Sequence, residues 1–440
     1  MKMRYLSFGL FLFGLSFEAS VFAQSQELYV SRTAWLRQSH LGGTARYTSL
    51  GGAMSALGND PGAMLDNPAS SAMYRVGEWR GSAGQQTDNQ KVSSGLNQGA
   101  YVHVFDVGLG IRASVAGGYA LESHQTSPWN LYGTGSVSWV DQWLANAQGQ
   151  TPEELAAQAN NTYQAYYEYI IDYDPSNGQW TPGAQGGPAA TVESIKLQEK
   201  GGVTFLNGSM QTGNASFGIT LERIWRSSDW NNKIIEEGFS NSGLVQRFSW
   251  TTTETSQWSA YRTRVGFLYR NDTPWRFSIA WRSMATGTRR DSITSLMVGE
   301  SNLMDLMPIK VYSHRTDDWT SPWEANIGLA FVHDKFGLGT AQVHIQPDGW
   351  MQFRLGVEKR DGPWSYRAGY RYTSHTGKYD FSGEQTGSLG MGIRGKRWTI
   401  DGGWALTLRE GRWNSLYVID EWDTPLVGTK AVLTLGYRID

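Results

Sequence analysis

The stretch RTRVGFLYRNDTPWRFSIAWR, residues 262–282, decides how this chain folds. Val265, Phe267 and Tyr269 are apolar and alternate with a second set of positions, in which residues 262, 264, 266 and 270 are arginine or glycine. Side chains of a β-strand point alternately to its two faces, so this pattern predicts a strand with one apolar and one charged face. The turn residues NDTP (271–274) follow, and the alternation returns from Trp275 to Trp281. The stretch therefore predicts a β-hairpin.

The same unit recurs along the chain, strongly from 262 to the end and more weakly before it. Tight turns are expected near 106, 211–213, 271–274, 334–336, 361–363 and 395–397, whereas most connections at the opposite ends are long. Short turns on one side and long loops on the other are typical of outer-membrane barrels, which have an even number of strands. The weaker early strands are expected at 79–87, 100–105, 107–121, 201–210 and 215–226, which brings the total to about fourteen.

We therefore predict an all-β fold, a transmembrane antiparallel β-barrel of about fourteen strands over residues 78–440. Its long extracellular loops are expected at 123–198, 228–254, 284–322 and 409–428. The 20 Trp, 21 Tyr and 52 Gly residues fit aromatic girdles and tight turns. The alternative is a secreted β-sandwich or propeller, whose outward positions should be polar. Here nearly every strand carries an apolar face that ends in Trp or Tyr.

The first residues predict export. Lys2 and Arg4 precede an apolar run over 5–17, and Val21-Phe22-Ala23 fits a signal peptidase site. We expect a signal peptide at 1–23, cleaved near Ala23, and a location in the bacterial outer membrane. No later window has the roughly 18 uncharged apolar residues that a spanning helix needs. The chain has no cysteine and a formal charge of -2, which argues against disulfides, thiolate metal sites and nucleic-acid partners.

Residues 24–77 are predicted to form a hatch, or plug, inside the barrel. The segment SLGGAMSALGNDPGAMLDNPAS spans 49–70, and the spacing of its apolar residues predicts a helix over 45–57. Gly51 and Gly52 keep this helix slim enough to pack against strands. The tripeptide Asn67-Pro68-Ala69 predicts a fixed bend, since the residue before proline is restricted and asparagine caps backbone groups. The alternative for this tripeptide is an ordinary loop.

Arginines occupy many positions on the polar face of the predicted strands. A charge at mid-bilayer costs about 2 to 4 kcal/mol, so these side chains are expected to face the lumen. They either pair with carboxylates, for which Asp60, Asp66, Glu324, Glu358 and Asp401 are candidates, or they line a solvated pore that favours anions. The arginines concerned are Arg262, Arg264, Arg270, Arg276, Arg282, Arg354, Arg367, Arg371 and Arg394.

Four features together resemble the FadL family of outer-membrane transporters, the FadL/TodX group. They are the signal peptide, the small-residue segment that ends in Asn67-Pro68-Ala69, the strands, about fourteen in number, and the long loops. The resemblance implies that outer loops gather a hydrophobic ligand, which passes to a pocket above the hatch and leaves sideways through a gap in the third strand. Gly117 and Gly118 are the candidates for that gap, with ordinary strand glycines as the alternative. The last strand ends in Tyr437-Arg438-Ile439-Asp440 and departs from the family's usual final Phe.

Two of the predicted loops are more apolar than solvated connections need to be. They are interpreted as a groove that binds a small hydrophobic or amphiphilic compound of the fatty-acid kind. The alternatives are a packed lid or a subunit contact. The candidate ligand-binding residues are Ile234, Ile235, Phe239, Leu296, Met297, Leu303, Met304, Leu306 and Met307.

No set of residues suggests an enzyme. The seven histidines form no metal or nucleophile motif, so catalytic residues, metals and cofactors are not expected. In the largest loop, Thr151 to Glu154 reads as a capping box that opens a helix. Two other functions stay open: a scaffold or shuttle component of protein secretion, with a protein partner on the long outer loops, or an open porin.

Overall fold

The computed structural model describes residues 42–88, 91–133, 138–184, 187, 190–239, 244–347, 349–374, 381–411 and 424–439. The predicted signal peptide and its cleavage site, the first part of the predicted hatch and most of the predicted loop 409–428 lie outside these residues. No helix in the described part of the chain is long and apolar enough to cross a membrane.

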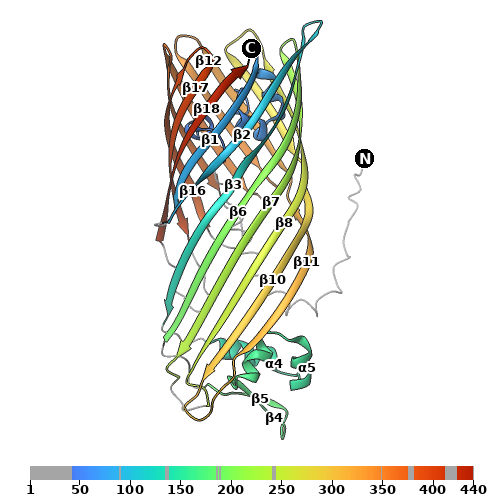
Figure 1. Ribbon diagram of the computed structural model, residues 1–440, viewed down its shortest axis with the longest axis vertical. Coiled ribbons are helices and arrows are strands. Elements are labelled where there is room, and N and C mark those ends of the chain that lie inside the picture. Colours follow the sequence, from blue (N-terminus) through green and yellow to red (C-terminus); the bar gives the residue numbers. More distant parts are fainter. Residues whose placement is uncertain are drawn as a thin grey trace, which may run out of the picture. The chain divides into compact units, whose positions relative to one another are not determined.

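The main sheet is antiparallel and closes on itself (Figure 1). Neighbours in the sheet follow the chain order, and the last strand pairs with the first, Gly77 opposite Ile439. The strands are β1 (Gly77–Asp88), β2 (Lys91–Gly108), β3 (Ile111–Gly133), β6 (Ala190–Thr212), β7 (Ala215–Glu237), β8 (Arg247–Arg270), β9 (Trp275–Arg282), β10 (Ala285–Glu300), β11 (Ile309–Ser321), β12 (Glu324–His333), β13 (Gly337–Ile345), β14 (Met351–Asp361), β15 (Trp364–Ser374), β16 (Phe381–Arg394), β17 (Trp398–Gly411) and β18 (Thr424–Ile439).

These sixteen segments make fourteen strands. Strands β9 and β10 both pair with β8, one after the other, so they form one strand that is interrupted only at residues 283–284. Likewise β11 pairs with β10 and β12 pairs with β9, with a break at residues 322–323. The predicted antiparallel barrel of fourteen strands is therefore confirmed. Most tight turns also lie where they were predicted, except that the first lies at 109–110.

The barrel has a closed part and a longer one-sided part. Beyond Ala120, β3 pairs only with β6, and β11 pairs only with β10. Strands β3, β6, β7, β8, β10 and β11 thus continue past the rest as a curved sheet, here called the extension (Figure 1). The outer face of the closed part is apolar, with Ile219 and Leu221 exposed on β7. Further along the same strand the outward positions are Ser227, Asp229, Asn231 and Lys233.

The extension corrects the predicted loops. Residues 228–254 are largely strand, because β7 runs to Glu237 and β8 starts at Arg247. The predicted loop 284–322 contains the hairpin of β10 and β11, and 123–198 begins and ends with strand. Alternation failed to show these parts because both faces of the extension are polar over much of their length. A strand in water with no apolar face gives no period-two signal.

The middle of the predicted loop 123–198 folds into a small domain, here called the cap, at the far end of the extension (Figure 1). It consists of α4 (Trp139–Ala147), α5 (Pro152–Gln158), α6 (Asn161–Tyr167), β4 (Ile171–Asp174) and β5 (Gln179–Pro182). The capping box at Thr151 and Glu154 is confirmed: Thr151 Oγ1 accepts from the Glu154 amide, and Glu154 Oε2 accepts from the Thr151 amide at 2.8 Å. The helix that it opens ends early, since Ala159 adopts a left-handed conformation.

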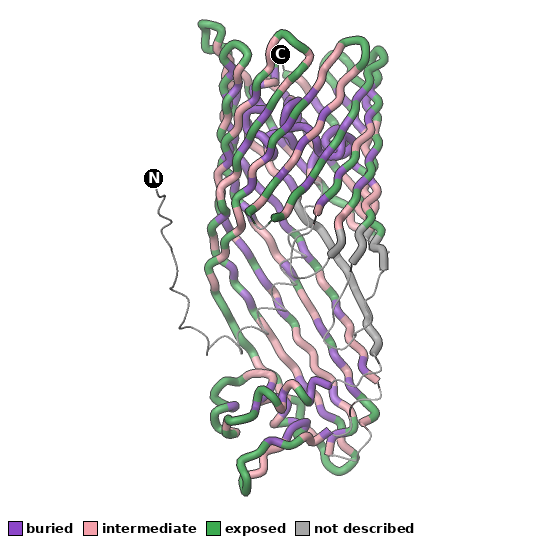
Figure 2. The backbone as a smooth tube through the Cα atoms, turned by 180° about the vertical axis from the view of Figure 1, so that it is seen from behind, coloured by how far each residue is buried: buried purple, intermediate pink, exposed green. Residues whose placement is uncertain are grey.

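The N-terminal segment lies inside the closed part, at the end of the short turns, and is almost entirely buried (Figure 2). It forms α2 (Ala45–Ser49), α3 (Pro61–Asp66) and the short 3-10 helix η1 (Pro68–Met73). The helix predicted over 45–57 is wrong beyond Ser49, because Gly51 and Gly52 both have positive φ and end it. The N-terminal hatch itself is present.

Candidate ligand path

The Asn67-Pro68-Ala69 tripeptide joins the hatch to three wall strands. Asn67 Oδ1 accepts from the Ala69 amide at 3.0 Å, which fixes the bend predicted from the sequence. Asn67 Nδ2 donates to the Phe267 carbonyl on β8 at 3.0 Å, and Asn207 Nδ2 on β6 donates to the Pro68 carbonyl at 3.1 Å. On β7, a Cβ added to Gly218 would collide with the Pro68 carbonyl carbon and the Ala69 amide. The tripeptide therefore contacts a side chain of β6 and the backbone of β7 and β8.

Glycines at inward wall positions make the close fit possible. A side chain at Gly266 would overlap the Asn67 amide, and one at Gly356 would approach the Leu50 carbonyl oxygen at 2.7 Å. The hatch has its own counterpart, since a Cβ on Gly51 would lie 2.7 Å from the Tyr370 carbonyl oxygen. At such a contact only glycine lets two backbones approach. Gly403 does the same against Ala45, so the hatch rests on glycines around the wall.

Buried ion pairs hold the hatch to the wall. Arg354 on β14 contacts Asp66 at 2.9 Å and donates to the Tyr47 hydroxyl at 2.7 Å. Arg80 on β1 contacts Asp60 at 2.9 Å. All these groups are buried, so each charge needs its partner. The hatch is thus fixed by paired charges as well as by shape.

The prediction that lumen arginines pair with carboxylates is confirmed for six of the nine named arginines, and each of the five named acids contacts an arginine. Among the described residues, Arg270, Arg276 and Arg394 form no ion pair. Glu324 contacts Arg282 at 2.9 Å, and Asp401 contacts Arg367 at 2.7 Å. Glu358 takes the guanidinium groups of three arginines, at 2.7 to 3.0 Å. Those three are Arg46, Arg360 and Arg367; the roles of Arg46 and Arg80 were missed, because neither lies in a strongly alternating segment.

An apolar row crosses the inner wall next to the hatch. Strand register places five apolar residues in line on β3, β6, β7, β8 and β11, with Gly287 of β10 between the last two. The row lies one inward position beyond Phe205 and Ala100, which pack against Met64 and Tyr74 of the hatch. Barrel interiors are usually polar, so this row is a departure. We call it the apolar arc: Ala120, Val203, Ile224, Ala260 and Trp319.

The opposite side of the lumen is polar. Gln342, Gln352, Thr373 and Thr386 are buried at inward positions of β13 to β16. On the other side, Trp319 packs over Ile224, Ala260 and Ala285. The lumen beside the hatch therefore has one apolar row on this side and a polar wall opposite it. Sequence reasoning missed the arc, because its members lie on separate strands and only the register brings them together.

The predicted ligand-binding residues divide into two groups. Four of them pack with the aromatic core of the cap around Trp143: Ile234, Phe239, Met297 and Leu306. This is the arrangement that the alternative, a packed lid, predicts. Leu303, Met304 and Met307 are exposed in the connection between β10 and β11, and Ile235 and Leu296 are half-buried. The structure therefore does not bring the nine residues together into one groove.

Polar contacts fasten the cap to the inner face of the extension. Gln164 Nε2 of α6 donates to the carbonyls of Ser295 and Ile309 at 2.9 and 3.1 Å. Glu168 accepts from the Gly299 amide at 2.7 Å. Burial raises the pKa of the Glu168 carboxyl, and this hydrogen bond lowers it in part. The cap is therefore a docked, folded unit.

Several solved structures share this architecture. No family profile and no curated protein match the sequence. The Pseudomonas putida toluene transporter TodX aligns over 91% of this chain and 99% of its own, with 12% identity and a TM-score of 0.57. The monoaromatic hydrocarbon channel CymD aligns over 91% of this chain and 98% of its own, with 10% identity and a TM-score of 0.57. The Ralstonia pickettii toluene transporter TbuX aligns over 92% of this chain and 100% of its own, with 14% identity and a TM-score of 0.54. The chain has the fold of the FadL-type channels.

A lateral gap in the third strand was predicted at Gly117 and Gly118. The structure contradicts that placement, since both residues pair in register with β2 and with β6. An irregularity lies instead in β2, where Asn97 is an extra residue: Ser82 faces Gln98 and Ala83 faces Leu96. A glycine pair alone does not open a β-ladder when the neighbouring strands keep it in register.

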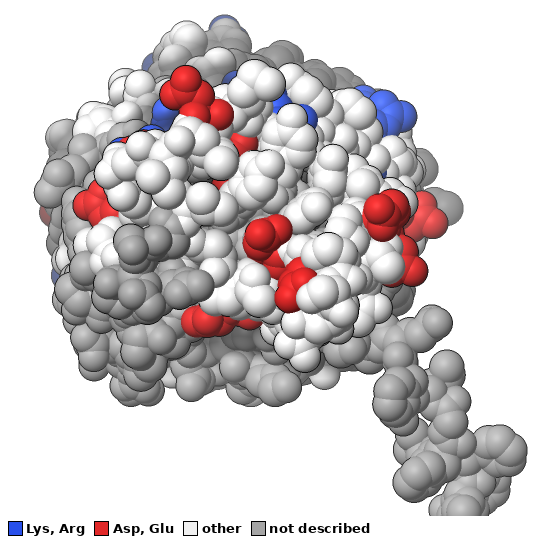
Figure 3. Space-filling model, turned by 90° about the horizontal axis from the view of Figure 1, so that it is seen from below, with Lys and Arg blue, Asp and Glu red and all other residues white. Residues whose placement is uncertain are grey.

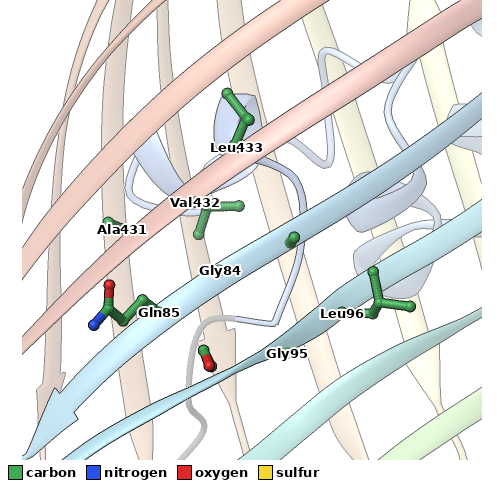
Figure 4. A pocket seen from close by; sticks show the side chains of 9 residues that line it. Gly84, Gln85, Gly95, Leu96, Ala431, Val432 and Leu433 are labelled. Carbon is green, nitrogen blue, oxygen red and sulfur yellow. The ribbon is translucent and has the colours of Figure 1, made fainter.

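The outer wall is hollowed beside this bulge (Figure 4). A cavity of about 540 Å³ lies over β1, β2 and β18. Small residues, Ala83, Gly84, Gly95 and Ala431, form much of its lining. Leu96 and Leu433 also line it and are strongly exposed. Beside the bulge the wall therefore carries mainly small side chains and two exposed leucines.

The cap end carries negative charge. From residue 138 to 184 the sequence has six carboxylates and no Lys or Arg. Seen from this end, the described surface displays carboxylates at several places and few basic groups (Figure 3). Among the described residues no three His, Cys, Asp or Glu side chains are placed to hold a metal ion. The acids are Asp141, Glu153, Glu154, Glu168, Asp172 and Asp174.

Proposed function

We propose that this protein is an outer-membrane channel for the uptake of small hydrophobic compounds. The apolar outer face of the closed part would lie in the lipid bilayer, and the polar extension would carry the cap into water outside the cell. A ligand would enter beneath the cap and meet the apolar arc. It would leave past the hatch, with lateral release through the hollowed wall of β1, β2 and β18 as one route.

The apolar arc is the observation that carries this proposal. Water wets the inner wall of an ion channel or an open porin, so polar side chains are expected there and a row of apolar side chains is not. A hydrophobic solute gains about 25 cal/mol per Å² of apolar surface removed from water, so the arc would hold it. The fixed hatch beside the arc argues against an open porin. The fold shared with channels named for toluene and monoaromatic hydrocarbons points the same way.

Equilibrium binding of radiolabelled toluene to the purified full-length protein in mild detergent tests the proposal. Strand β7 offers a matched pair: Ile224 faces the lumen within the arc, whereas Ile219 is exposed on the outer face. Ile224→Ser should weaken toluene binding about tenfold or more, because it places a hydroxyl in the arc. Ile219→Ser should leave binding unchanged. Equal binding by both variants would contradict the proposal.

A protein-secretion role is the second candidate, and two observations favour it. Strand β3 pairs without a break through Gly117 and Gly118, and the folded acidic cap offers a large polar surface to a protein partner. Mild-detergent extraction from native membranes separates the two functions. A recurring apolar compound in the extract, found by mass spectrometry, supports the channel. Secreted proteins that co-purify with an empty barrel support the scaffold.

A further inference from the structure

The apolar arc ends at a buried polar side chain. Gln98 of β2 lies beside Ala120, the first member of the arc, and its side chain is 1% exposed. Among the described residues, neither its Nε2 nor its Oε1 has a hydrogen-bond partner. A buried polar group without a partner costs about 1 to 3 kcal/mol. Such groups in native proteins call for an explanation, and a ligand is one.

The bulge in β2 places a second carboxamide next to the first. In a regular strand Asn97 and Gln98 would point to opposite faces, but a bulge re-aims one of the two side chains. The Asn97 side chain covers inward-facing Gly84, where an added Cβ would lie 3.0 Å from Asn97 Cγ. Within the part of the chain that the structure describes, Asn97 Nδ2 is also buried without a hydrogen-bond partner. These three amide atoms belong to two consecutive residues at one end of the arc.

The charges nearby show which head group these amides fit. Arginines at inward positions next to the amides and the arc are already paired: Arg80 with Asp60 at 2.9 Å, Arg226 with Glu199 at 3.2 Å, and Arg289 with Glu254 at 2.7 Å. A carboxylate ligand would find no free cation among these three. A neutral hydroxyl or carbonyl, in contrast, can accept from Nε2 or donate to Oε1.

We propose that the Asn97–Gln98 bulge is a head-group site that selects neutral amphiphiles, with an apolar body on the arc and one hydroxyl or carbonyl on the carboxamides. This rests on the proposed uptake function and narrows it. The ligand class is then phenols, alcohols or ketones, in preference to fatty-acid anions. Bare hydrocarbons bind the arc alone.

The test compares toluene, p-cresol and p-toluate, which share a ring and methyl group and differ in the head group. Each is measured by equilibrium binding to the full-length protein in mild detergent. The wild type should bind p-cresol about fivefold more tightly than toluene, as one hydrogen bond allows. It should bind p-toluate most weakly. In Gln98→Leu the advantage of p-cresol should vanish, while toluene binding stays the same.

The controls keep the outcomes separate. Gln385→Leu changes an exposed, outward amide and should alter nothing. If Gln98→Leu does not fold, Asn97→Ala provides the same comparison. A wild type that binds none of the three ligands would refute the proposed channel. Toluene binding without any preference for p-cresol, or a preference that survives Gln98→Leu, would refute the head-group site alone and leave ordered water as the partner of the amides.

Discussion

The closed barrel and the extension share six strands, yet different forces stabilise them. In the closed part, apolar side chains face outward and the hatch fills the bore with buried ion pairs and glycine contacts. In the extension, the outward face is polar and stability comes from the backbone ladder and the packed cap. Strand β7 shows the change within one element, from Ile219 and Leu221 to Asp229 and Lys233. One ladder thus spans two solvents, and side chains adapt it to each.

Breaking one ion pair in each region should give the largest contrast. Arg354→Met leaves Asp66 buried without its partner, so the free energy of unfolding should fall by about 3 to 5 kcal/mol. Arg315 and Asp317 on β11 also pair, but both are substantially exposed. Arg315→Ala should cost about 1 kcal/mol or less. Urea unfolding in lipid vesicles, followed by tryptophan fluorescence, measures both. Similar costs would show that the hatch is not locked by charge.

A charge placed on the outer face of β7 should locate the boundary between the two regions. Leu221→Arg puts a charge where the closed part is proposed to face lipid and should cost about 2 to 4 kcal/mol. Asp229→Arg changes the outward face of the extension and should cost little. The same unfolding assay applies, and Ser227→Lys, which lies between these two positions on β7, gives an intermediate point. Equal costs would place both residues in one solvent.

A wall glycine opposite the hatch should have a smaller effect than either charge. Gly266→Val drives a side chain into the Asn67 amide, and overpacking of this kind costs about 1 to 3 kcal/mol. Gly208→Val on β6 is the matched control, since an added Cβ there meets nothing within 4 Å. Differential scanning calorimetry of the two variants in detergent distinguishes them. Equal melting temperatures would mean that the hatch does not press on this wall.

How much the sequence revealed follows the same division. Where lipid and lumen impose opposite polarities, as from Val265 to Trp281, alternation predicted the strands and most of their turns. The arginine pairing and the Asn67 bend were also predictable, because a buried charge and an Asn-Pro step each have few solutions. In the extension the two faces have similar polarity, so its strands were read as loops.

The site was harder to predict than the fold. The apolar arc and the unpartnered Gln98 depend on the register of strands far apart in sequence, which no local pattern encodes. Several apolar residues that composition alone assigned to ligand capture, such as Met297, pack in the core of the cap instead. The inward glycines could have been noticed, since Gly218 and Gly266 interrupt otherwise bulky strands.

Single-channel conductance in a planar bilayer tests the central claim most directly: the hatch, and not the cap, closes the bore. The full-length protein should be electrically silent. Deletion of residues 24–76 should produce steady ion conductance, whereas replacement of residues 138–184 by a short Gly-Ser linker should leave the barrel silent. A conducting full-length protein, or a hatch deletion that folds and stays silent, would contradict the account.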